Sequence, residues 1–397
     1  MNKSMRIRKF FRHKTALQLG LVIFSVVLVG MVILAAGGCG GWQESPPRIG
    51  VIVPLTGGAA DFGKWARQGV EIALEELKSE SASGDLGVKA IYEDNQMDPK
   101  LGLAAFKKLR EVDGVIGVIT SGSGVVLAIA PEGERTKTVQ LNHSAVNPDI
   151  RKAGEYTFSL VNDAKAETRR MAELAIDVLG INEMAILYAN TAYGVGTKDA
   201  MVESFVAAGG RVIGTVAFPE NFTDMRTHLL KLREMQPEAT YFIATIKDSG
   251  KLLKQAAEVG VETQWLSFNA FESPEVIDIA GPAAEGVIYT SSNLFDLPDP
   301  GARPRGFIEA YVTKYGERPN LYAATAYDAA HLLFAAYRAS GGDRRRVQQY
   351  LSAVSNYEAA SGRITFDEDG AVEKPMFLKI VEGGEFVVFE HSSRAVR

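Results

Sequence analysis

From Arg48 onward, short apolar runs alternate with amphipathic segments, and this alternation constrains the fold more than any other feature of the sequence. Several runs are apolar at consecutive positions, which is typical of strands that are covered on both faces. Such alternation predicts an α/β fold with doubly wound sheets of parallel strands. The expected strands are 48–54, 88–92, 114–119, 139–142, 184–189, 212–218, 240–246, 265–268 and 286–290.

Helix-start and helix-end signals bound the amphipathic segments between these runs. Asp98-Pro99 precedes an expected helix, because proline is favoured in a first helical turn. Gly180 ends the helical pattern of 166–179. Further helical patterns cover 305–315, 321–340 and 344–355, and hairpin-like β signals cover 363–366 and 376–389.

The length of the chain predicts more than one domain. About 350 residues follow the N-terminal segment, which exceeds what a single hydrophobic core usually supports. The alternation of strand and helix patterns is interrupted at 151–160, which we expect to be an extended connector. It is interrupted again at the proline-containing stretch 291–304. The sequence by itself does not locate a sharp domain boundary.

The N-terminus carries six Lys or Arg residues, then an uncharged apolar stretch at 16–38, and then Cys39, the only cysteine. This order is typical of a secretory signal. With Cys39 at the cleavage position, it resembles the lipobox of bacterial lipoproteins, although Ala36 stands where a larger aliphatic residue is favoured. The resemblance implies a signal peptide at 1–38, a lipid on Cys39, a tether at 39–47 and a periplasmic, membrane-anchored protein. An uncleaved membrane anchor stays open as the alternative, because about 20 apolar residues suffice to span a bilayer.

Charge and cysteine content exclude several classes of function. Residues 1–38 contain six basic and no acidic residues, so their removal moves the net charge from −5 to −11. An acidic protein of this kind is not expected to bind nucleic acid or anionic lipid headgroups. Without further cysteines there can be no disulfides, no thiol catalysis and no cysteine metal site.

The motifs of the main enzyme classes are missing from the sequence. Gly122-Ser123-Gly124 lacks the third glycine of a dinucleotide fingerprint, since Leu127 stands there. No G-x-S-x-G elbow of a serine hydrolase is present. The five histidines show no paired metal spacing. We therefore expect a protein that is not an enzyme and that has no cofactor and no metal.

A series of different short motifs follows along the chain, and together they cover essentially all of 48–397. They are 49–58, Phe62-Gly63, Gly69, Asp94-Asn95-Gln96, Asp98-Pro99, Val115-Ile116-Gly117, Thr120-Ser121-Gly122, Ser144-Ala145, Asn147-Pro148, Tyr193-Gly194, Asp224, Gln255-Ala256, Gly260, Ala280-Gly281, Ala284-Glu285-Gly286, Tyr322-Ala323 and Ala326-Tyr327-Asp328. In this order they resemble the leucine/isoleucine/valine-binding type of solute-binding protein from branched-chain amino acid ABC transporters.

The resemblance implies two lobes, joined by three crossings, that close on a ligand like a hinged clamp. The N-terminal lobe would comprise 48–162 plus 292–355, and the C-terminal lobe 163–291 plus 356–397. The expected function is capture of an amino acid or related small carboxylate and its delivery to ABC permease subunits. A ligand-sensing receptor with the same binding fold stays open as the alternative.

The resemblance also implies a set of ligand-binding residues. Ser121 would hold a carboxylate at the start of a helix, where free backbone N–H groups favour anions, although an ordinary helix cap is the competing interpretation. The loop at 144–146 would meet the polar end of the ligand, and Phe62 would form an aromatic wall, with Trp65 at the entrance or in interlobe packing. The full set is Phe62, Ser121, Ser144, Ala145, Val146, Tyr193, Thr245 and Asn269.

Two positions depart from the family pattern. Val146 often has a threonine counterpart, and Asn269 stands where Asp or Glu usually pairs with the ammonium of the ligand. A neutral amide cannot supply a charge-assisted hydrogen bond, which is roughly twice as strong as a neutral one. Glu272 could substitute if its loop is shifted. The hypothesis from the sequence is a small carboxylate that is not necessarily an α-amino acid.

Overall fold

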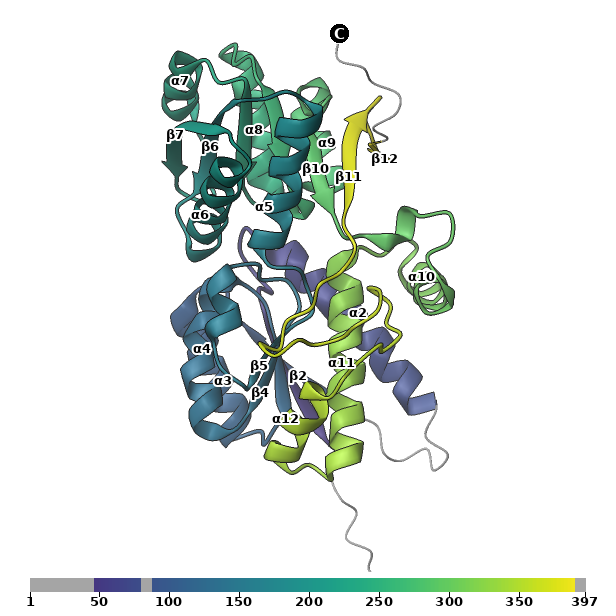
Figure 1. The fold of residues 1–397 in the computed structure, drawn as a ribbon. Helices are drawn as coiled ribbons and strands as arrows, with labels where there is room; N and C mark the ends of the chain where they lie inside the picture. The colour runs from purple at the N-terminus through teal and green to yellow at the C-terminus, as the bar shows by residue number, and fades with distance from the viewer. Residues whose placement is uncertain (1–45, 80–87, 390–397) are drawn as a thin grey trace, which may run out of the picture. The chain divides into compact units, whose positions relative to one another are not determined.

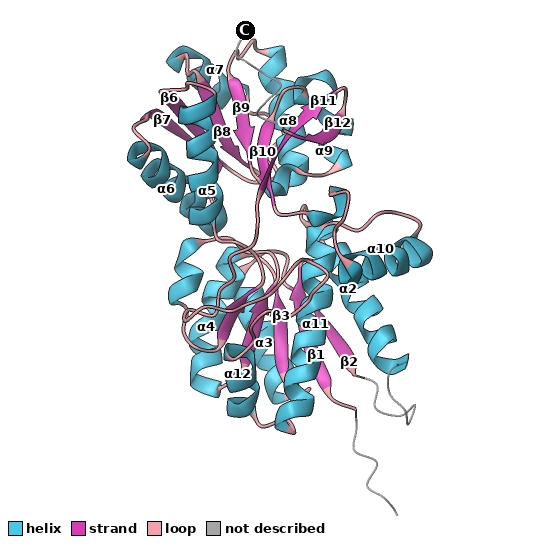
Figure 2. Cartoon of the chain, turned by 45° about the vertical axis from the view of Figure 1, so that its right-hand side comes forward, coloured by secondary structure: helices cyan, strands magenta, loops and turns pink. Residues whose placement is uncertain are grey.

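A computed structural model describes residues 46–79 and 88–389 of the chain. The predicted signal peptide and Cys39 lie outside these residues. Within the described ranges, no helix has both the length and the apolar character needed to cross a membrane. The strands form two sheets, each with helices packed against it (Figures 1 and 2).

The first sheet has five parallel strands in the order β2-β1-β3-β4-β5. Successive residues of β1 alternate between two apolar clusters. Val51 and Val53 pack with α2 and α11, whereas Ile52 packs with α3 and α4. Both faces of the sheet are therefore covered, as the consecutive apolar positions predict. The elements are β1 (Arg48–Val53), α2 (Ala60–Ser79), β2 (Lys89–Asp94), α3 (Pro99–Glu111), β3 (Gly117–Thr120), α4 (Ser123–Thr136), β4 (Val139–Asn142), η2 (Pro148–Lys152), β5 (Thr157–Ser159), α10 (Ala302–Tyr315), α11 (Leu321–Ser340) and α12 (Arg344–Ser352).

The second sheet has seven strands in the order β12-β11-β10-β9-β8-β6-β7. All neighbours are parallel except β10–β11 and β11–β12, so the C-terminal hairpin closes one edge of a parallel sheet. The elements are α5 (Ala164–Glu173), η3 (Leu174–Val178), β6 (Glu183–Ala189), α6 (Ala192–Ala207), β7 (Arg211–Phe218), α7 (Arg226–Met235), β8 (Ala239–Ile243), α8 (Ile246–Glu258), β9 (Gln264–Ser267), η4 (Asn269–Phe271), α9 (Pro274–Ala280), η5 (Gly281–Ala284), β10 (Ile288–Ser291), η6 (Leu294–Asp296), β11 (Phe377–Glu382) and β12 (Glu385–Val388).

Two local expectations are wrong. The segment 151–160 contains a strand, β5, which pairs with β4 although it has only three residues. The β signal at 363–366 gives only an isolated bridge between Tyr357 and Ile364, because no further strand lies beside it.

Helix α11 is central to the first lobe because it packs closely against α2. A Cβ on Gly69 of α2 would lie 2.0 Å from the backbone oxygen of Ala323, so only glycine permits this approach. Six of the α11 residues in the apolar cluster shared with α2 are alanines, whose small side chains let two helix backbones come close together.

The lobe boundaries remain a prediction, but the described contacts bear on the third crossing. Ile364, Phe366 and Val372 pack in the same apolar cluster as the first sheet. The chain then enters the second sheet at Phe377. We therefore propose that the third crossing lies at 373–376 rather than just after Ser355.

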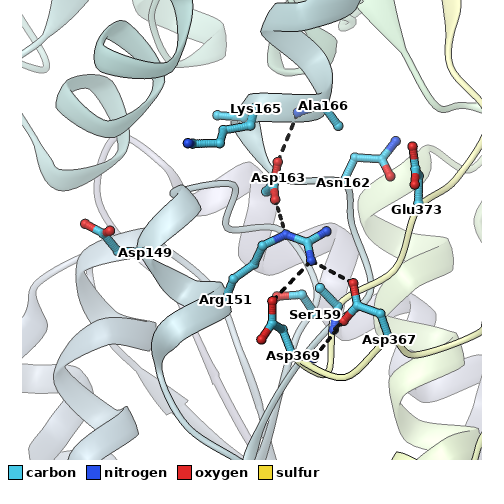
Figure 3. Close-up of polar contacts among 12 residues, drawn as sticks. Asp149, Arg151, Ser159, Asn162, Asp163, Lys165, Ala166, Asp367, Asp369 and Glu373 are labelled. Atoms are coloured by element: carbon cyan, nitrogen blue, oxygen red, sulfur yellow. Dashed lines mark hydrogen bonds and ion pairs between the residues drawn. The ribbon is translucent and has the colours of Figure 1, made fainter. Parts of the chain in front are cut away.

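Arg151 links the start of α5 to the segment 367–369 (Figure 3). Its Nε donates to Asp163, which is also the N-cap of α5. Its Nη1 donates to Asp367 Oδ2 at 2.6 Å, and Asp369 lies 3.7 Å from the same nitrogen. One guanidinium thus holds segments together that are more than two hundred positions apart in the sequence.

Candidate functional site

A cavity of about 310 Å³ lies where loops from the carboxyl ends of both sheets meet. Parallel α/β sheets leave such a crevice at this edge, because each strand ends there and the chain turns into a helix. The volume is in the range of small-molecule sites. The lining residues are Phe62, Met97, Pro99, Gly122, Ser123, Gly124, Ser144, Ala145, Val146, Thr191, Ala192, Tyr193, Glu220, Ala244, Thr245, Phe268, Asn269, Ala270 and Tyr322.

The start of α4 provides hydrogen-bond donors to this cavity. The N-cap residue is Gly122, with a φ of 91°, and it offers no side chain to the free N–H groups of the first turn. Ser123 is 3% exposed, and its Oγ has no partner among the described residues. Uncapped N–H groups and an unpaired hydroxyl beside a cavity form a favourable place for an anion.

Ser121, the predicted carboxylate contact, lies behind the cavity wall and not on it. Its side chain is fully buried, and its Oγ shares a hydrogen bond of 2.8 Å with Ser144 Oγ. Ser144 itself lines the cavity, as do Ala145 and Val146. Ser121 therefore contributes by orienting Ser144, while Ser123, two residues later, is the serine of α4 that faces the cavity.

Tyr193 and Thr245, at the carboxyl edge of the second sheet, line the cavity. Thr191 caps α6 by accepting a hydrogen bond from Gly194 N at 3.2 Å, which fixes the turn that carries Tyr193. The hydroxyl of Tyr193 donates to the Ala244 carbonyl at 3.3 Å, and burial raises the pKa of this phenol. Tyr193 is therefore a neutral, fixed part of the wall.

Asn269 lies on the wall with its amide already engaged. Its Nδ2 donates to Glu167 Oε1 at 2.9 Å, and its Oδ1 accepts from the Tyr322 hydroxyl at 3.3 Å. Glu167 is 1% exposed and also accepts a hydrogen bond from Thr290. Burial raises the pKa of Glu167 to about 7. A carboxylate thus lies next to position 269, but it contacts the cavity only through the amide.

Glu272 does not take the place of the missing acid. Its carboxylate accepts hydrogen bonds from Ser291, from Asn293 Nδ2 at 3.2 Å and from Lys379 Nζ at 2.5 Å. It does not line the cavity. Because these three donors surround it, the suggestion that it substitutes at the ammonium position is wrong.

Aromatic side chains close the remaining side of the cavity. The rings of Phe62 and Tyr322 meet edge to face with centroids 4.7 Å apart. Trp65 stacks on Tyr322 at 6.1 Å but does not line the cavity, so it packs behind the wall rather than at an entrance. Such aromatic pairs add to the stability of the wall beyond their buried area.

Sequence reasoning missed several wall residues, among them Met97, Ser123, Thr191 and Glu220. A signal for Glu220 existed, since it follows the predicted strand 212–218 at the carboxyl edge where the other wall residues lie. No cluster of three or more His, Cys, Asp or Glu residues suited to a metal ion occurs in the described ranges.

Comparisons with known proteins agree with the fold. The Leu/Ile/Val-binding protein homolog 1 of Brucella suis is 24% identical over 362 residues, covering 90% of this chain and 94% of that protein. A leucine-binding protein from Thermotoga maritima has a TM-score of 0.81 at 26% identity, covering 87% of this chain and 98% of its own.

The same fold occurs in a more distant structure. A solute-binding protein of an R. palustris ABC transporter, in complex with benzoate, has a TM-score of 0.78 at 18% identity, covering 87% of this chain and 95% of its own. The predictions of a two-lobed α/β binding fold and of a protein that is not an enzyme are confirmed, because the matched family consists of solute-binding proteins. The periplasmic binding protein family matches residues 46–385, and the chain belongs to that family.

Proposed function

We propose that this protein captures a small organic carboxylate between its two lobes and delivers it to the permease of an ABC importer. The single observation that carries the proposal is the uncapped start of α4, with Ser123 Oγ unpaired at a largely apolar cavity. A bound carboxylate would satisfy those donors, and the aromatic and alanine walls would cover its hydrocarbon part. Leucine and benzoate, named for two relatives, share that combination.

The mechanism that we propose is closure by differential contact. A ligand favours the closed arrangement only if it binds both walls, and the cavity is lined from both sheets. The lobes also contact each other directly. Asn147 Nδ2 donates to the Ala192 carbonyl at 2.6 Å, and Lys247 lies 3.1 Å from Asp61. These contacts would add to the closed state when the solute has brought the walls together.

The proposal includes export and a lipid anchor on Cys39, outside the described residues. The support is the basic, apolar and small-residue order of 1–38 together with the single cysteine. Expression of Cys39→Ser in a bacterial host should release the protein from the membrane fraction, or leave its precursor uncut. Continued lipid attachment in that variant would contradict the anchor.

The ligand class can be tested by calorimetry with acids and their amides. We expect leucine, 4-methyl-2-oxopentanoate or benzoate to bind, and leucinamide and benzamide to bind at least 10-fold more weakly, as for loss of a hydrogen bond to a charged group. Ser123→Ala should weaken acid binding by a similar factor. Ser249→Ala is the matched control, because Ser249 Oγ is also buried and unpaired but lies away from the cavity. Equal binding of acids and amides would contradict the proposal.

A further inference from the structure

We propose that Glu220 is the group in the cleft that recognises a protonated amine of the solute. The inference rests on the proposed function and narrows its solute class to carboxylates that also carry an amine. In this proposal the solute amine is bound by Glu220 at the end of β7. The amide of Asn269, at the end of β9, does not bind the amine. Among the described residues, Glu220 is the only acidic or basic side chain on the cavity wall.

The carboxylate of Glu220 has no hydrogen-bond or ion-pair partner in the described part of the chain. None of the hydrogen bonds or ion pairs found in residues 46–79 and 88–389 involves its carboxylate, whereas the neighbouring Asp248 has partners. Asp248 accepts from Asn221 N at 2.8 Å and lies 3.6 Å from Lys251 Nζ. Lys251 therefore pairs with Asp248, and it makes no ion pair with Glu220 in the described residues.

The surroundings of Glu220 make an unpaired negative charge unfavourable. Burial raises the pKa of Glu220, and the negative charge of Asp248 raises it further. A partly buried carboxylate is stabilised by a cation or by hydrogen-bond donors. Since residues 46–79 and 88–389 supply neither, we infer that the solute supplies the positive group.

Position 269 cannot perform this role. The Asn269 amide is held between Glu167 and Tyr322, so both of its ends are occupied. The sheet order β9-β8-β6-β7 separates the ends of β9 and β7 by three strand spacings. At about 4.8 Å per spacing this is roughly 14 Å. A solute amine bound by Glu220 therefore points to a different side of the cleft from one bound at position 269.

In each of two pairs of probes, one compound carries an amine that its partner lacks. Leucine is compared with 4-methylpentanoate, and 4-(aminomethyl)benzoate with 4-ethylbenzoate, by calorimetry on the purified protein. In at least one pair we expect the amine to bind about 10- to 100-fold more tightly, the range of a charge-assisted hydrogen bond. Glu220→Gln should bring that ratio close to one. Glu234→Gln, which removes an exposed carboxylate on α7, should leave it unchanged.

The outcomes separate this inference from the proposed function. The role of Glu220 would be overturned if the affinity ratio between amine and amine-free probes persists in Glu220→Gln. It would also be overturned if the wild-type protein binds the amine-free carboxylates as tightly as the amines. Either result would leave carboxylate capture intact. Binding of 3-methylbutylamine, which is leucine without its carboxylate, as tightly as leucine, and loss of that binding in Glu220→Gln, would support Glu220 and contradict the carboxylate class. A protein that binds none of these compounds contradicts both.

Discussion

Replacing Glu167 by glutamine removes a buried carboxyl group whose ionisation is unfavourable in the folded protein. Glu167 lies in α5, is 1% exposed, and accepts hydrogen bonds from Asn269 and Thr290. No basic side chain pairs with it among the described residues. Glutamine keeps the size of the side chain and one acceptor oxygen, so the substitution changes mainly the charge.

The size of the effect follows from the pKa of this group. Burial raises the pKa of Glu167 from 4.5 to about 7. Below pH 4.5 the carboxyl is protonated in both the folded and the unfolded chain, and the stability linked to this proton is fully present. Between pH 4.5 and 7 the unfolded chain ionises first, so that stability is lost as pH rises. The loss amounts to up to about 3 kcal/mol, at 1.36 kcal/mol per pKa unit.

Urea denaturation of the wild-type protein and Glu167→Gln from pH 4.5 to pH 8.5 measures this. We expect the free energy of unfolding of the variant to rise relative to the wild type by up to about 3 kcal/mol across that range. Loss of one hydrogen bond in the variant shifts the difference in unfolding free energy between variant and wild type by the same amount at every pH. It does not change the slope of that difference against pH. Glu309→Gln, at an exposed position of α10, is the control and should give no slope. A difference for Glu167→Gln that does not vary with pH would refute the reasoning.

Three further substitutions test the frame around the cleft. Lys379→Met leaves Glu272 buried without its cation and should cost about 3–5 kcal/mol of unfolding free energy in urea denaturation, so a loss below 1 kcal/mol would contradict a structural role for the pair. Asp163→Ala removes the α5 cap that accepts from Ala166 N at 3.0 Å, and should cost about 1–2 kcal/mol by the same assay. Gly194→Ala places a Cβ 1.9 Å from a backbone oxygen of β6, and should cost about 1–3 kcal/mol; a melting temperature equal to that of the wild type would show that the helix can shift freely.

The sequence predicts the strands well where burial on both faces leaves an unbroken apolar run. β6 and β8 begin within one residue of the expected positions. The sequence does not predict β5, because a strand of three residues carries no periodic signal. The strand forms because β4 offers a free edge. The return of 359–372 to the first core is likewise set by tertiary packing and not by any local pattern.

The candidate site is predictable to the level of strand ends but not of individual side chains. Tyr193, Thr245 and Asn269 were proposed from the family resemblance, and each of them follows a strand and lines the cavity. Which serine of the α4 loop faces the cavity depends on the residue at which the helix begins, and this decides between Ser121 and Ser123. The significance of Glu220 depends on which acids have partners, and only the three-dimensional contacts show that.

The strand order of the second sheet has a consequence for biosynthesis. β10 is complete at Ser291, but its outer neighbour β11 begins only at Phe377, after the chain has passed through α10, α11 and α12. A polypeptide synthesised from the N-terminus onward therefore keeps an unpaired strand edge until β11 at 377–382 is available, and such edges recruit other chains. The β11–β12 hairpin covers the edge of β10 only after the other strands of both sheets have been synthesised. A product that terminates before Phe377 would therefore be prone to aggregate, even if its first sheet has formed.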